Sequence, residues 1–422
     1  MHKRLLLVAY HFPPVQGSTG VTRTLAFAKY LRESDWEVTI LTVHPRAYAS
    51  ERAENLALVP DYVHVERAWA LDARRHLAIR ERYPLLLAVP DRWQSWIAGG
   101  LWRARKIVQR WRPHVVLSTY PIASAHCIGY GIHRMFGLPW IADFRDPMAQ
   151  EGYPPEPLIH RAYQSIERRV FSHAARVVVT TSGTEQLYVS RFPSYPRTAI
   201  RVIANGFDEE MFPSRPVSRQ DREPGRPLRI LHSGLLYSDE RNPEALFAAL
   251  AELRTEGNLV DGEVEFRFRA SGNEEQYAPV VRSLGLTACV QLLPPIPYRE
   301  ALEEMQAVDA LLLMQASNCN QQIPAKLYEY LYAQRPILAL TDPAGDTAAL
   351  LRQLGAGNVA PLDDKQAIKA LLREFLRELR QDGAFVVPRA RVQQFSRRDL
   401  TRSLAALLDE VVSEAAVQPA GA

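Results

Sequence analysis

The first apolar run of the chain reads Leu5-Leu6-Leu7-Val8-Ala9-Tyr10, and it leads into Phe12-Pro13-Pro14-Val15-Gln16-Gly17-Ser18-Thr19-Gly20. A run this short, which meets a proline pair almost at once, is neither a signal-peptide core nor a membrane span. A buried strand explains it better. A helical pattern follows from about Val21 to Ser34. Strand, glycine-containing loop and helix together are the first unit of a parallel sheet.

The same alternation of short apolar runs and longer helical patterns continues along the chain and predicts two successive parallel sheets. In the first half, further strands are expected at 37–42, 114–118, 139–143, 176–180 and 200–203. In the second half, strands are expected at 228–232, 263–270, 290–292, 310–313, 336–340 and 358–360. Helices are expected there at 243–254, 298–307, 325–333, 347–354 and 365–379.

The length of 422 residues exceeds what one hydrophobic core organises, so two domains are expected. A polar, proline-rich stretch without periodicity at 209–227 predicts the linker between them. The N-terminal domain is then 1–208 and the C-terminal domain is 228–394. Residues 395–422 carry a final amphipathic helix.

The composition is that of a globular protein, with 47% hydrophobic and 23% charged residues. Its three cysteines, Cys127, Cys289 and Cys319, are widely separated, which predicts neither a metal site nor a disulfide framework and favours the cytoplasm. Residues 1–205 carry 27 Lys+Arg against 16 Asp+Glu, whereas residues 206–422 carry 24 against 31. The two halves therefore face different electrostatic partners or lie against each other, unless the asymmetry is random drift.

Two loops follow strands and contain glycines that let the backbone approach an anion. Gly17 lies in the first loop, before the helix that starts near Val21. Gly234 lies in the second loop, which continues to Arg241, a residue placed to contact a phosphate. Neither loop has the dinucleotide spacing G-x-G-x-x-G, so a dinucleotide-dependent oxidoreductase is the least favoured function. A structural turn at Gly17 and a surface arginine at Arg241 are the alternatives.

The strongest pattern is Gln321-Gln322-Ile323-Pro324-Ala325-Lys326-Leu327-Tyr328-Glu329-Tyr330-Leu331. A helix that starts at its proline presents the unpaired amides of Ala325, Lys326 and Leu327 at the positive end of the helix. These amides and the Lys326 ammonium would hold a diphosphate. Glu329, one turn further along, can accept hydrogen bonds from both hydroxyls of a ribose. The alternative is a surface Lys–Glu pair on a routine helix.

At these residues the chain resembles glycosyltransferase family 4 and its relatives with the GT-B fold, most of all the bacterial branch that builds surface polysaccharides. The other matching stretches, in order, are Tyr10-His11-Phe12-Pro13-Pro14 with Gly17, Asp143-Phe144-Arg145-Asp146-Pro147, Val202-Ile203-Ala204-Asn205-Gly206-Phe207-Asp208, Gly234 through Pro243, and Phe395-Ser396-Arg397-Arg398. The resemblance spans nearly the whole chain. It implies an α/β fold of two facing Rossmann-like domains, with the C-terminal helix crossing back to the N-terminal domain.

The resemblance also implies retaining transfer from a nucleoside-diphosphate sugar to a glycan or lipid-linked acceptor, with no cofactor or metal required. Glu329 matches the second glutamate of the family's E-x7-E motif and would bind the donor ribose. Gln321 replaces the first glutamate, which acts near the donor sugar, so the sugar contact differs here. Leu235 replaces the family's arginine after the glycine of the second loop, which leaves Arg241 and Lys326 as the expected diphosphate partners.

Acceptor-side groups are expected in the N-terminal domain. His126 resembles a family histidine near the transferred sugar, and with Arg241 and Lys326 it makes up the expected catalytic set. The alternative is a helix histidine whose hydrogen bonds are satisfied. Charged residues after the strand at 139–143 either orient an acceptor hydroxyl or lock the loop by an internal ion pair; they are Asp143, Arg145 and Asp146.

Residues 92–112 interleave tryptophans with basic residues in an amphipathic helical pattern. Such a helix suits an anionic membrane surface, which predicts peripheral binding at the inner face of the cytoplasmic membrane and access to a lipid-linked acceptor. The alternative is a core helix that packs its tryptophans inward and exposes a solvated basic face. No nucleic-acid module is recognisable, so nucleic acid is not an expected partner.

Two other functions stay open for a chain of this fold. A sugar-nucleotide 2-epimerase would need neither an acceptor nor a membrane surface. A catalytically silent scaffold that binds a partner transferase is compatible with Gln321. Stabilisation by one nucleotide sugar in a thermal-shift panel would count against the silent scaffold.

Overall fold

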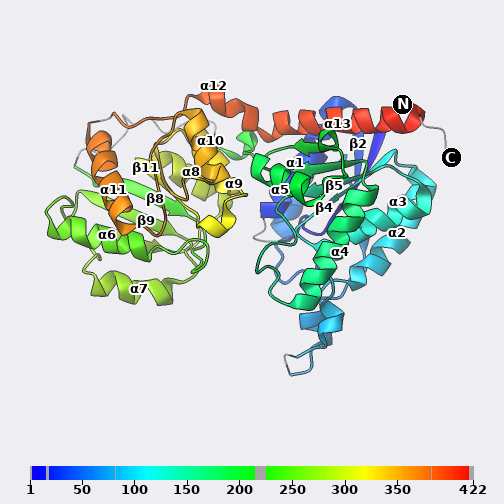
Figure 1. Cartoon of the computed structure of the whole chain (residues 1–422), viewed down its shortest axis with the longest axis horizontal. Coiled ribbons are helices and arrows are strands. Elements are labelled where there is room, and N and C mark those ends of the chain that lie inside the picture. Colours follow the sequence, from blue (N-terminus) through cyan, green and yellow to red (C-terminus); the bar gives the residue numbers. More distant parts are fainter. Residues whose placement is uncertain (1, 16–18, 81, 214–224, 382, 418–422) are drawn as a thin grey trace. The chain divides into compact units, whose positions relative to one another are not determined.

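The computed structural model describes the chain except for residues 1, 16–18, 81, 214–224, 382 and 418–422. The chain divides into two compact units, each of which is coloured by sequence in Figure 1. The first unit comprises residues 1–204 and 397–422, and the second comprises 205–396. Residues 214–224 of the expected linker at 209–227 lie outside the described residues.

The first unit is built on a parallel sheet with the strand order β3-β2-β1-β4-β5-β6-β7. The strands are β1 (Lys3–Ala9), β2 (Trp36–Val43), β3 (His64–Ala68), β4 (Val115–Thr119), β5 (Trp140–Phe144), β6 (Arg176–Val179) and β7 (Ile200–Val202). Every residue of β4 and β5 is buried, as expected for strands that are covered on both faces. The strand order reverses between β1 and β4.

Helices cover both faces of this sheet, and each face has its own apolar core. The helices are α1 (Thr19–Tyr30), α2 (Ser95–Trp111), α3 (Ala123–Phe136), α4 (Pro157–His173), α5 (Ser182–Arg191) and α13 (Arg397–Val417). On one face, Trp96 of α2 and Ile128 of α3 pack with Val170 of α4. On the other face, Phe27 of α1 packs with Leu404 of α13.

The C-terminal helix α13 is part of the first unit, which confirms the predicted return of the chain. Its apolar side chains contribute to the core beside α1. Its polar side chains form hydrogen bonds and ion pairs with other elements of the first unit. Asp409 accepts from Lys3 Nζ at 2.6 Å and from Trp36 Nε1 at 2.9 Å. Glu410 accepts from Arg176 at 2.6 Å.

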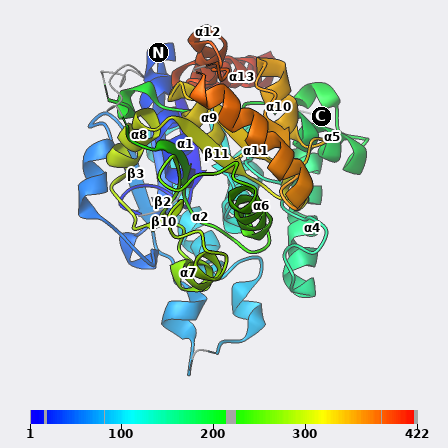
Figure 2. The ribbon, with the colours of Figure 1, turned by 90° about the vertical axis from the view of Figure 1, so that its left-hand side faces the viewer.

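The second unit has a parallel sheet with the order β10-β9-β8-β11-β12-β13, which reverses between β8 and β11. The strands are β8 (Leu228–Ser233), β9 (Val264–Arg269), β10 (Val290–Leu293), β11 (Ala310–Met314), β12 (Ile337–Leu340) and β13 (Val359–Ala360). The helices are α6 (Glu244–Thr255), α7 (Glu274–Ser283), α8 (Tyr298–Ala307), α9 (Ala325–Tyr332), α10 (Asp346–Leu354), α11 (Lys365–Arg380) and α12 (Arg389–Val392). Helices α6 and α11 lie side by side (Figure 2) and are joined by Lys369, whose Nζ lies 2.7 Å from Glu252.

The two sheets confirm the predicted α/β architecture, since both have the order of a doubly wound, Rossmann-like sheet. One strand, β3, was absent from the sequence-based prediction. Its sequence, His64-Val65-Glu66-Arg67-Ala68, lacks an apolar run because it lies at the sheet edge, where four of its five residues are exposed or half-buried. No helix within the described part of the chain has the length and hydropathy needed to cross a membrane.

Candidate functional site

In the second unit, a lysine lies beyond the carboxyl end of β8, beside the point where the strand order reverses. Open α/β sheets bind ligands at such switch points. Gly234 follows β8 with a φ of 115°, and a Cβ atom on it would lie 2.8 Å from Nζ of Lys326. Glycine is required here both by the backbone conformation and by the close approach of the ammonium.

The Lys326 ammonium rests on a buried histidine. Its Nζ lies 3.3 Å from Nε2 of His232, and Nδ1 of the same ring lies 3.0 Å from the carbonyl oxygen of Leu312. The ring therefore donates from Nδ1 and offers the lone pair of Nε2 to the ammonium. Burial, followed by the charge of Lys326, lowers the pKa of His232 well below its usual value. His232 is a neutral hydrogen-bond acceptor that orients Lys326.

The charge on Lys326 is poorly compensated within the protein. Burial and then the Arg241 guanidinium lower the pKa of Lys326 to about 7, whereas Glu329 raises it. These effects place the three charged groups in one cluster, with two cations against one carboxylate. A bound anion would favour the charged form of Lys326 and raise its pKa. The cluster is therefore suited to a ligand that carries at least one negative charge.

Helix α9 adds backbone donors to this cluster. It begins at Ala325, with Pro324 at its N-cap position. The amide of Leu327 donates to the carbonyl oxygen of Pro324 at 2.9 Å, so Leu327 does not offer the free amide that the sequence suggested. The amides of Ala325 and Lys326 are the remaining candidate donors at the positive end of the helix.

The other expected donor residues surround α9. Glu329 accepts a hydrogen bond from the Tyr298 hydroxyl at 2.7 Å. The guanidinium of Arg241 lies over the Tyr237 ring, with its central carbon 5.3 Å from the ring centroid. Gln321 is exposed on the loop before α9.

The buried side chain of Gln315 forms hydrogen bonds that hold the loop before α9. The Gln315 side chain donates to the carbonyl oxygens of Cys319 and Gln322, both at 2.9 Å. Its amide oxygen accepts from the Thr347 hydroxyl at 2.5 Å. Because these bonds use both ends of the side-chain amide, the loop that leads into Pro324 has a fixed conformation. Gln315 thus positions the N-terminus of α9 through the loop that precedes it.

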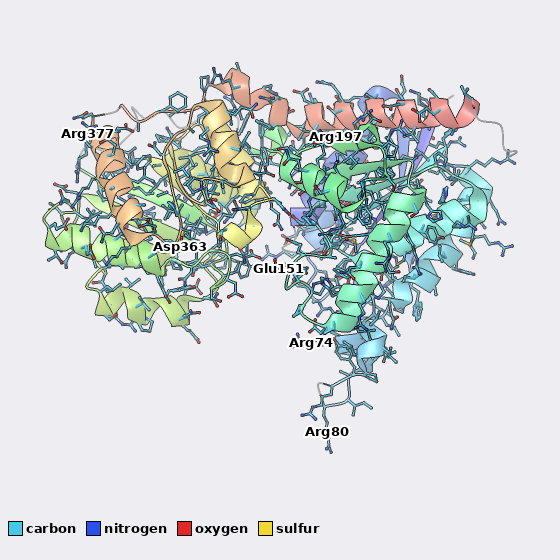
Figure 3. The ribbon with its side chains drawn as sticks, viewed as in Figure 1. Arg74, Arg80, Glu151, Arg197, Asp363 and Arg377 are labelled. Carbon is cyan, nitrogen blue, oxygen red and sulfur yellow. The ribbon has the colours of Figure 1, made fainter. Side chains whose placement is uncertain are left out.

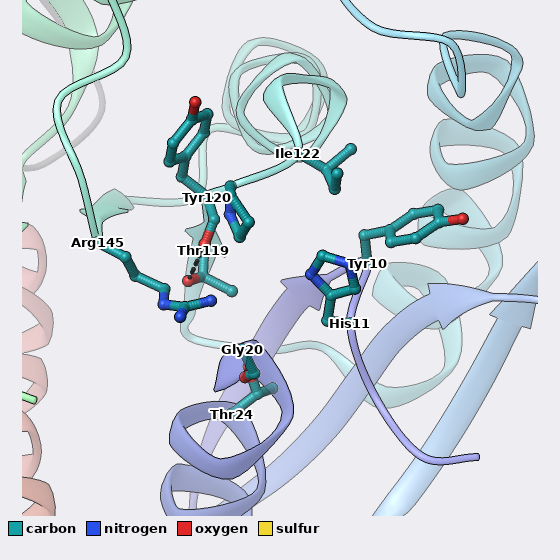
Figure 4. Close-up of a pocket in the computed structure, with 9 residues that line it drawn as sticks. Tyr10, His11, Gly20, Thr24, Thr119, Tyr120, Ile122 and Arg145 are labelled. Atoms are coloured by element: carbon teal, nitrogen blue, oxygen red, sulfur yellow. Dashed lines mark hydrogen bonds between the residues drawn. The ribbon is translucent and has the colours of Figure 1, made fainter. Parts of the chain in front are cut away.

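The first unit has a narrow pocket at the equivalent place in its own sheet, beyond the carboxyl ends of β1 and β4 (Figure 4). Its lining comes from the loops after β1, β4 and β5 and from α1, and consists of Tyr10, His11, Gly20, Thr24, Thr119, Tyr120, Pro121, Ile122 and Arg145. Nδ1 of His11 is buried and has no hydrogen-bond partner among the described residues. Burial, and next the Arg145 guanidinium, lowers the pKa of His11 to about 4. The pocket thus presents a neutral imidazole beside a guanidinium.

The three charged residues expected on the acceptor side have different environments. Asp143 accepts from Nη2 of Arg23 at 2.9 Å and from the Thr119 hydroxyl at 2.8 Å, and the side chains of Asp143 and Arg23 are only 1% and 2% exposed. Asp143 therefore forms the internal ion pair that was one of the two roles left open. Arg145 lines the pocket, and Asp146 follows it with a partly exposed side chain.

His126 lies inside the core of the first unit, away from the pocket lining. Its Nδ1 lies 2.8 Å from the Ser118 hydroxyl, and its ring centroid lies 4.7 Å from that of Phe144. Burial lowers the pKa of His126 to about 3, so the ring is neutral. The environment is that of a core histidine. Gly17 lies outside the described residues, and within the described residues no group of three or more His, Cys, Asp or Glu is arranged to hold a metal ion.

Part of the first unit matches a known protein family. No curated protein matches the sequence. Residues 18–206 match the family model described as "Glycosyl transferase 4-like domain". This part of the chain therefore resembles a glycosyltransferase domain.

Solved structures share the described fold over nearly the full length of the chain. Sucrose-phosphate synthase from Thermosynechococcus elongatus is 14% identical, with a TM-score of 0.71, and the match covers 98% of this chain and 100% of that one. Anabaena HepE in complex with UDP-glucose is 14% identical, with a TM-score of 0.66 and coverage of 97% and 100%. A trehalose 6-phosphate synthase from Burkholderia multivorans is 12% identical, with a TM-score of 0.64 and full coverage of both chains. At these identities the likeness concerns the fold.

Several groups in the two units were not predicted as site residues from the sequence. His232 was expected only as the end of a strand, and Arg23 was given no role within the expected first helix. His11 was quoted only as part of a motif. The signal for His232 was a polar residue near the end of a buried strand, two residues before a glycine. For Arg23, whose partner is 120 residues away, the sequence carries no local signal.

The tryptophans of the segment 92–112 mostly face the core of the first unit. Trp96 is fully buried, and Trp93 and Trp111 pack against the same core. Trp102 is 61% exposed, with Nζ of Lys106 3.7 Å from its ring centroid. For this segment the structure favours the core-helix alternative over a membrane-facing helix.

Proposed function

We propose that this protein transfers a sugar, with retention of configuration, from a nucleoside-diphosphate sugar to a glycan or lipid-linked acceptor of cell-surface polysaccharide synthesis. The reaction takes place in the cytoplasm, at or near the inner face of the membrane. The observation that carries the proposal is the Lys326 ammonium, held against Gly234 and His232 beside the Arg241 guanidinium.

The donor diphosphate would lie against this cluster. Lys326 and Arg241 supply positive charge, and the amides of Ala325 and Lys326 supply hydrogen-bond donors at the positive end of α9. Glu329 would accept from the ribose hydroxyls after exchanging its bond with the Tyr298 hydroxyl. Gln321, on the loop before α9, would approach the sugar as a neutral amide where the family has a carboxylate.

The same cations would promote bond cleavage. As the bond between the anomeric carbon and the diphosphate oxygen breaks, negative charge grows on the leaving group, and Lys326 and Arg241 stabilise it more than they stabilise the ground state. The acceptor oxygen forms the new bond to the anomeric carbon on the same face. Its proton passes to the departing phosphate oxygen, so no carboxylate base is needed.

The pocket of the first unit would contribute the acceptor-side groups. His11 is neutral and has one unpartnered ring nitrogen, and Arg145 lies beside it in the lining. These groups suit the hydroxyls of a sugar better than the core-bound His126 does. Asp143 would act indirectly, since its pair with Arg23 fixes the loop that carries Arg145.

A thermal-shift panel of UDP-, GDP-, ADP- and CMP-sugars tests the donor class, with UDP-glucose as the first member because HepE was solved with it. A true donor at 100 times its Kd stabilises the fold by about 2.7 kcal/mol. The Lys326→Ala variant should lose the shift and slow transfer by roughly 100-fold or more, the loss typical for removal of one transition-state donor. Arg377→Ala, an exposed residue of α11 paired with Glu374 on its own helix, is the matched control.

Product analysis separates this function from its rivals. NMR of the sugar released or transferred would detect inversion at carbon 2, which an epimerase produces. Absence of any shift in the panel would contradict the proposal and favour a silent scaffold. Undiminished transfer by the Lys326→Ala variant would overturn the site.

A further inference from the structure

Residues 73–80 and 82–88, here called the projection, extend away from the rest of the first unit (Figure 3), with Arg74 near the base and Arg80 at the far end. The projection begins with a π-helical turn at Ala73–Leu77 and ends with a 3-10 turn at Leu85–Ala88. Between them, Ile79 and Arg82 exchange backbone hydrogen bonds of 2.8 and 3.1 Å, which close a tight turn.

The base of the projection is fixed to the unit by buried carboxylates. Asp72 is fully buried and accepts from the Arg74 amide at 2.9 Å. Asp91, on the returning segment, accepts from the amide and hydroxyl of Ser124 at 2.7 and 2.9 Å. The Gln94 side chain donates to the Leu86 carbonyl oxygen at 2.7 Å. The projection is therefore held outward by specific bonds.

Large apolar side chains on the projection lie in solvent. Ile79 is 79% exposed, Leu86 is 72% exposed, Leu85 is 42% exposed and Leu77 is 38% exposed. Single exposed apolar side chains are common on protein surfaces, but a group of them on one narrow extension marks an interaction site.

The projection is also basic. Arg74, Arg75, Arg80 and Arg82 are exposed, and the single acidic residue in the segment is Glu81. Arg75 donates to the carbonyl oxygen of Tyr48, which is neutral and leaves the positive charge uncompensated. Exposed apolar side chains next to arginines are the combination that binds the interface of an anionic bilayer.

We propose that the projection docks this protein onto an anionic lipid bilayer. Ile79, Leu85 and Leu86 enter the boundary between headgroups and acyl chains, while the arginines contact the lipid phosphates. The docking element is thus the projection and not α2, whose tryptophans mostly pack into the core.

A second copy of the chain fits this surface less well than a bilayer does. A stable protein interface buries about 800 Å² on each partner. Four side chains on a narrow extension offer much less area, and two projections of the same charge repel each other. A bilayer surrounds such an extension and carries the opposite charge.

The test is vesicle flotation of the full-length protein, without sugar donor, using phosphatidylcholine vesicles with and without 30% phosphatidylglycerol. We expect binding to the anionic vesicles that weakens as salt is added. The double variant Ile79→Ser, Leu86→Ser should bind at least about tenfold more weakly, since both side chains lose their transfer from water. The double variant Arg80→Gln, Arg82→Gln should lose about fivefold per arginine on anionic vesicles only.

Two matched control variants test whether vesicle binding depends on the projection. Met135→Ser removes an apolar side chain that is 52% exposed on the same unit but outside the projection, and it should bind like the wild type. The pair Trp102→Ser, Lys106→Gln changes an exposed tryptophan and a half-buried lysine of α2 and should also leave binding intact. Thermal midpoints equal to that of the wild type exclude unfolding as the cause of any loss.

The proposal is overturned if the wild type does not float with any vesicle, or if the Ile79, Leu86 variant floats as well as the wild type. Loss of binding in the α2 variant alone would also overturn it. Concentration-dependent self-association that the Ile79, Leu86 variant abolishes, with no vesicle binding, would assign the surface to a second copy instead. Vesicle binding is measured without a donor, so its failure leaves the proposed reaction standing, and failure of the reaction leaves the docking surface standing.

Discussion

Each unit holds a basic side chain near the carboxyl ends of its strands, but the two units treat the charge in opposite ways. In the first unit, Arg23 is almost fully buried and is neutralised by two hydrogen bonds to Asp143. In the second unit, Lys326 faces another cation, Arg241, and rests on a neutral histidine. A buried charge that the protein pairs internally is structural. Two cations that share a single carboxylate beside backbone donors are suited to bind an anionic ligand.

The largest effect on stability is expected when the ion pair between Arg23 and Asp143 is removed. Asp143→Asn should lower the free energy of unfolding by about 3–5 kcal/mol, because Arg23 then remains buried without its counter-charge. Urea unfolding followed by circular dichroism measures the change. The double variant Arg23→Met, Asp143→Leu should recover much of the loss. A loss below about 1 kcal/mol in the single variant would show that the pair contributes little.

The substitution Gly234→Ala should displace the ammonium group of Lys326. A side chain at a φ of 115° is strained, and its Cβ would lie 2.8 Å from the ammonium, so Lys326 must move. We expect a stability loss of about 1–3 kcal/mol and a fall in donor affinity of more than about tenfold. Isothermal titration with the best donor of the panel measures the affinity. Gly257→Ala, where φ is also positive and no atom lies near, is the control for strain alone.

Donor binding should depend on pH through Lys326. In the free protein its pKa is about 7, and a bound diphosphate raises it, so binding takes up a proton above pH 7. Affinity should be highest below pH 7 and should fall by up to about tenfold per pH unit above it. Calorimetry in two buffers of different ionisation enthalpy detects the proton uptake. A pH-independent affinity between 7 and 9 would contradict the assignment.

Lys326 should also affect stability in the absence of ligand. The pKa of Lys326 is lower in the folded than in the unfolded chain, so the unfolded chain binds more protons between about pH 7 and 10 and the wild type gains stability as pH rises through this range. Lys326→Met removes the penalty and should melt at a higher temperature than the wild type. The difference in melting temperature between the variant and the wild type should be greatest below pH 7 and should disappear towards pH 10. A gap that does not change with pH would mean that the effect comes from packing.

The sequence was sufficient to predict what depends on local pattern. The apolar runs that became β1, β8 and β11 are buried on both faces, so their composition alone marked them. The helix start at Ala325 was marked by the proline before it. Strand β3 was missed because an edge strand needs no continuous apolar run.

What the sequence could not predict depends on residues brought together from far apart. His232 and Lys326 are 94 residues apart, and Arg23 and Asp143 are 120 residues apart. His126 was expected as a site residue from its resemblance to a family histidine, whereas its ring lies in the core and bonds Ser118. Tertiary packing decides whether a side chain points into a pocket or into the core. The spacing of residues along the chain does not give this direction.

The return of α13 to the first unit also has a consequence for synthesis. Leu404 and Leu408 complete a core that includes Leu5 and Leu7 of the first strand, and the ribosome makes them only after the entire second unit. The part of this sheet face that α13 covers therefore stays exposed while residues 205–396 are translated and fold. During this interval the nascent chain exposes apolar surface to chaperones and to aggregation. The second unit, which is continuous in sequence, can finish folding first.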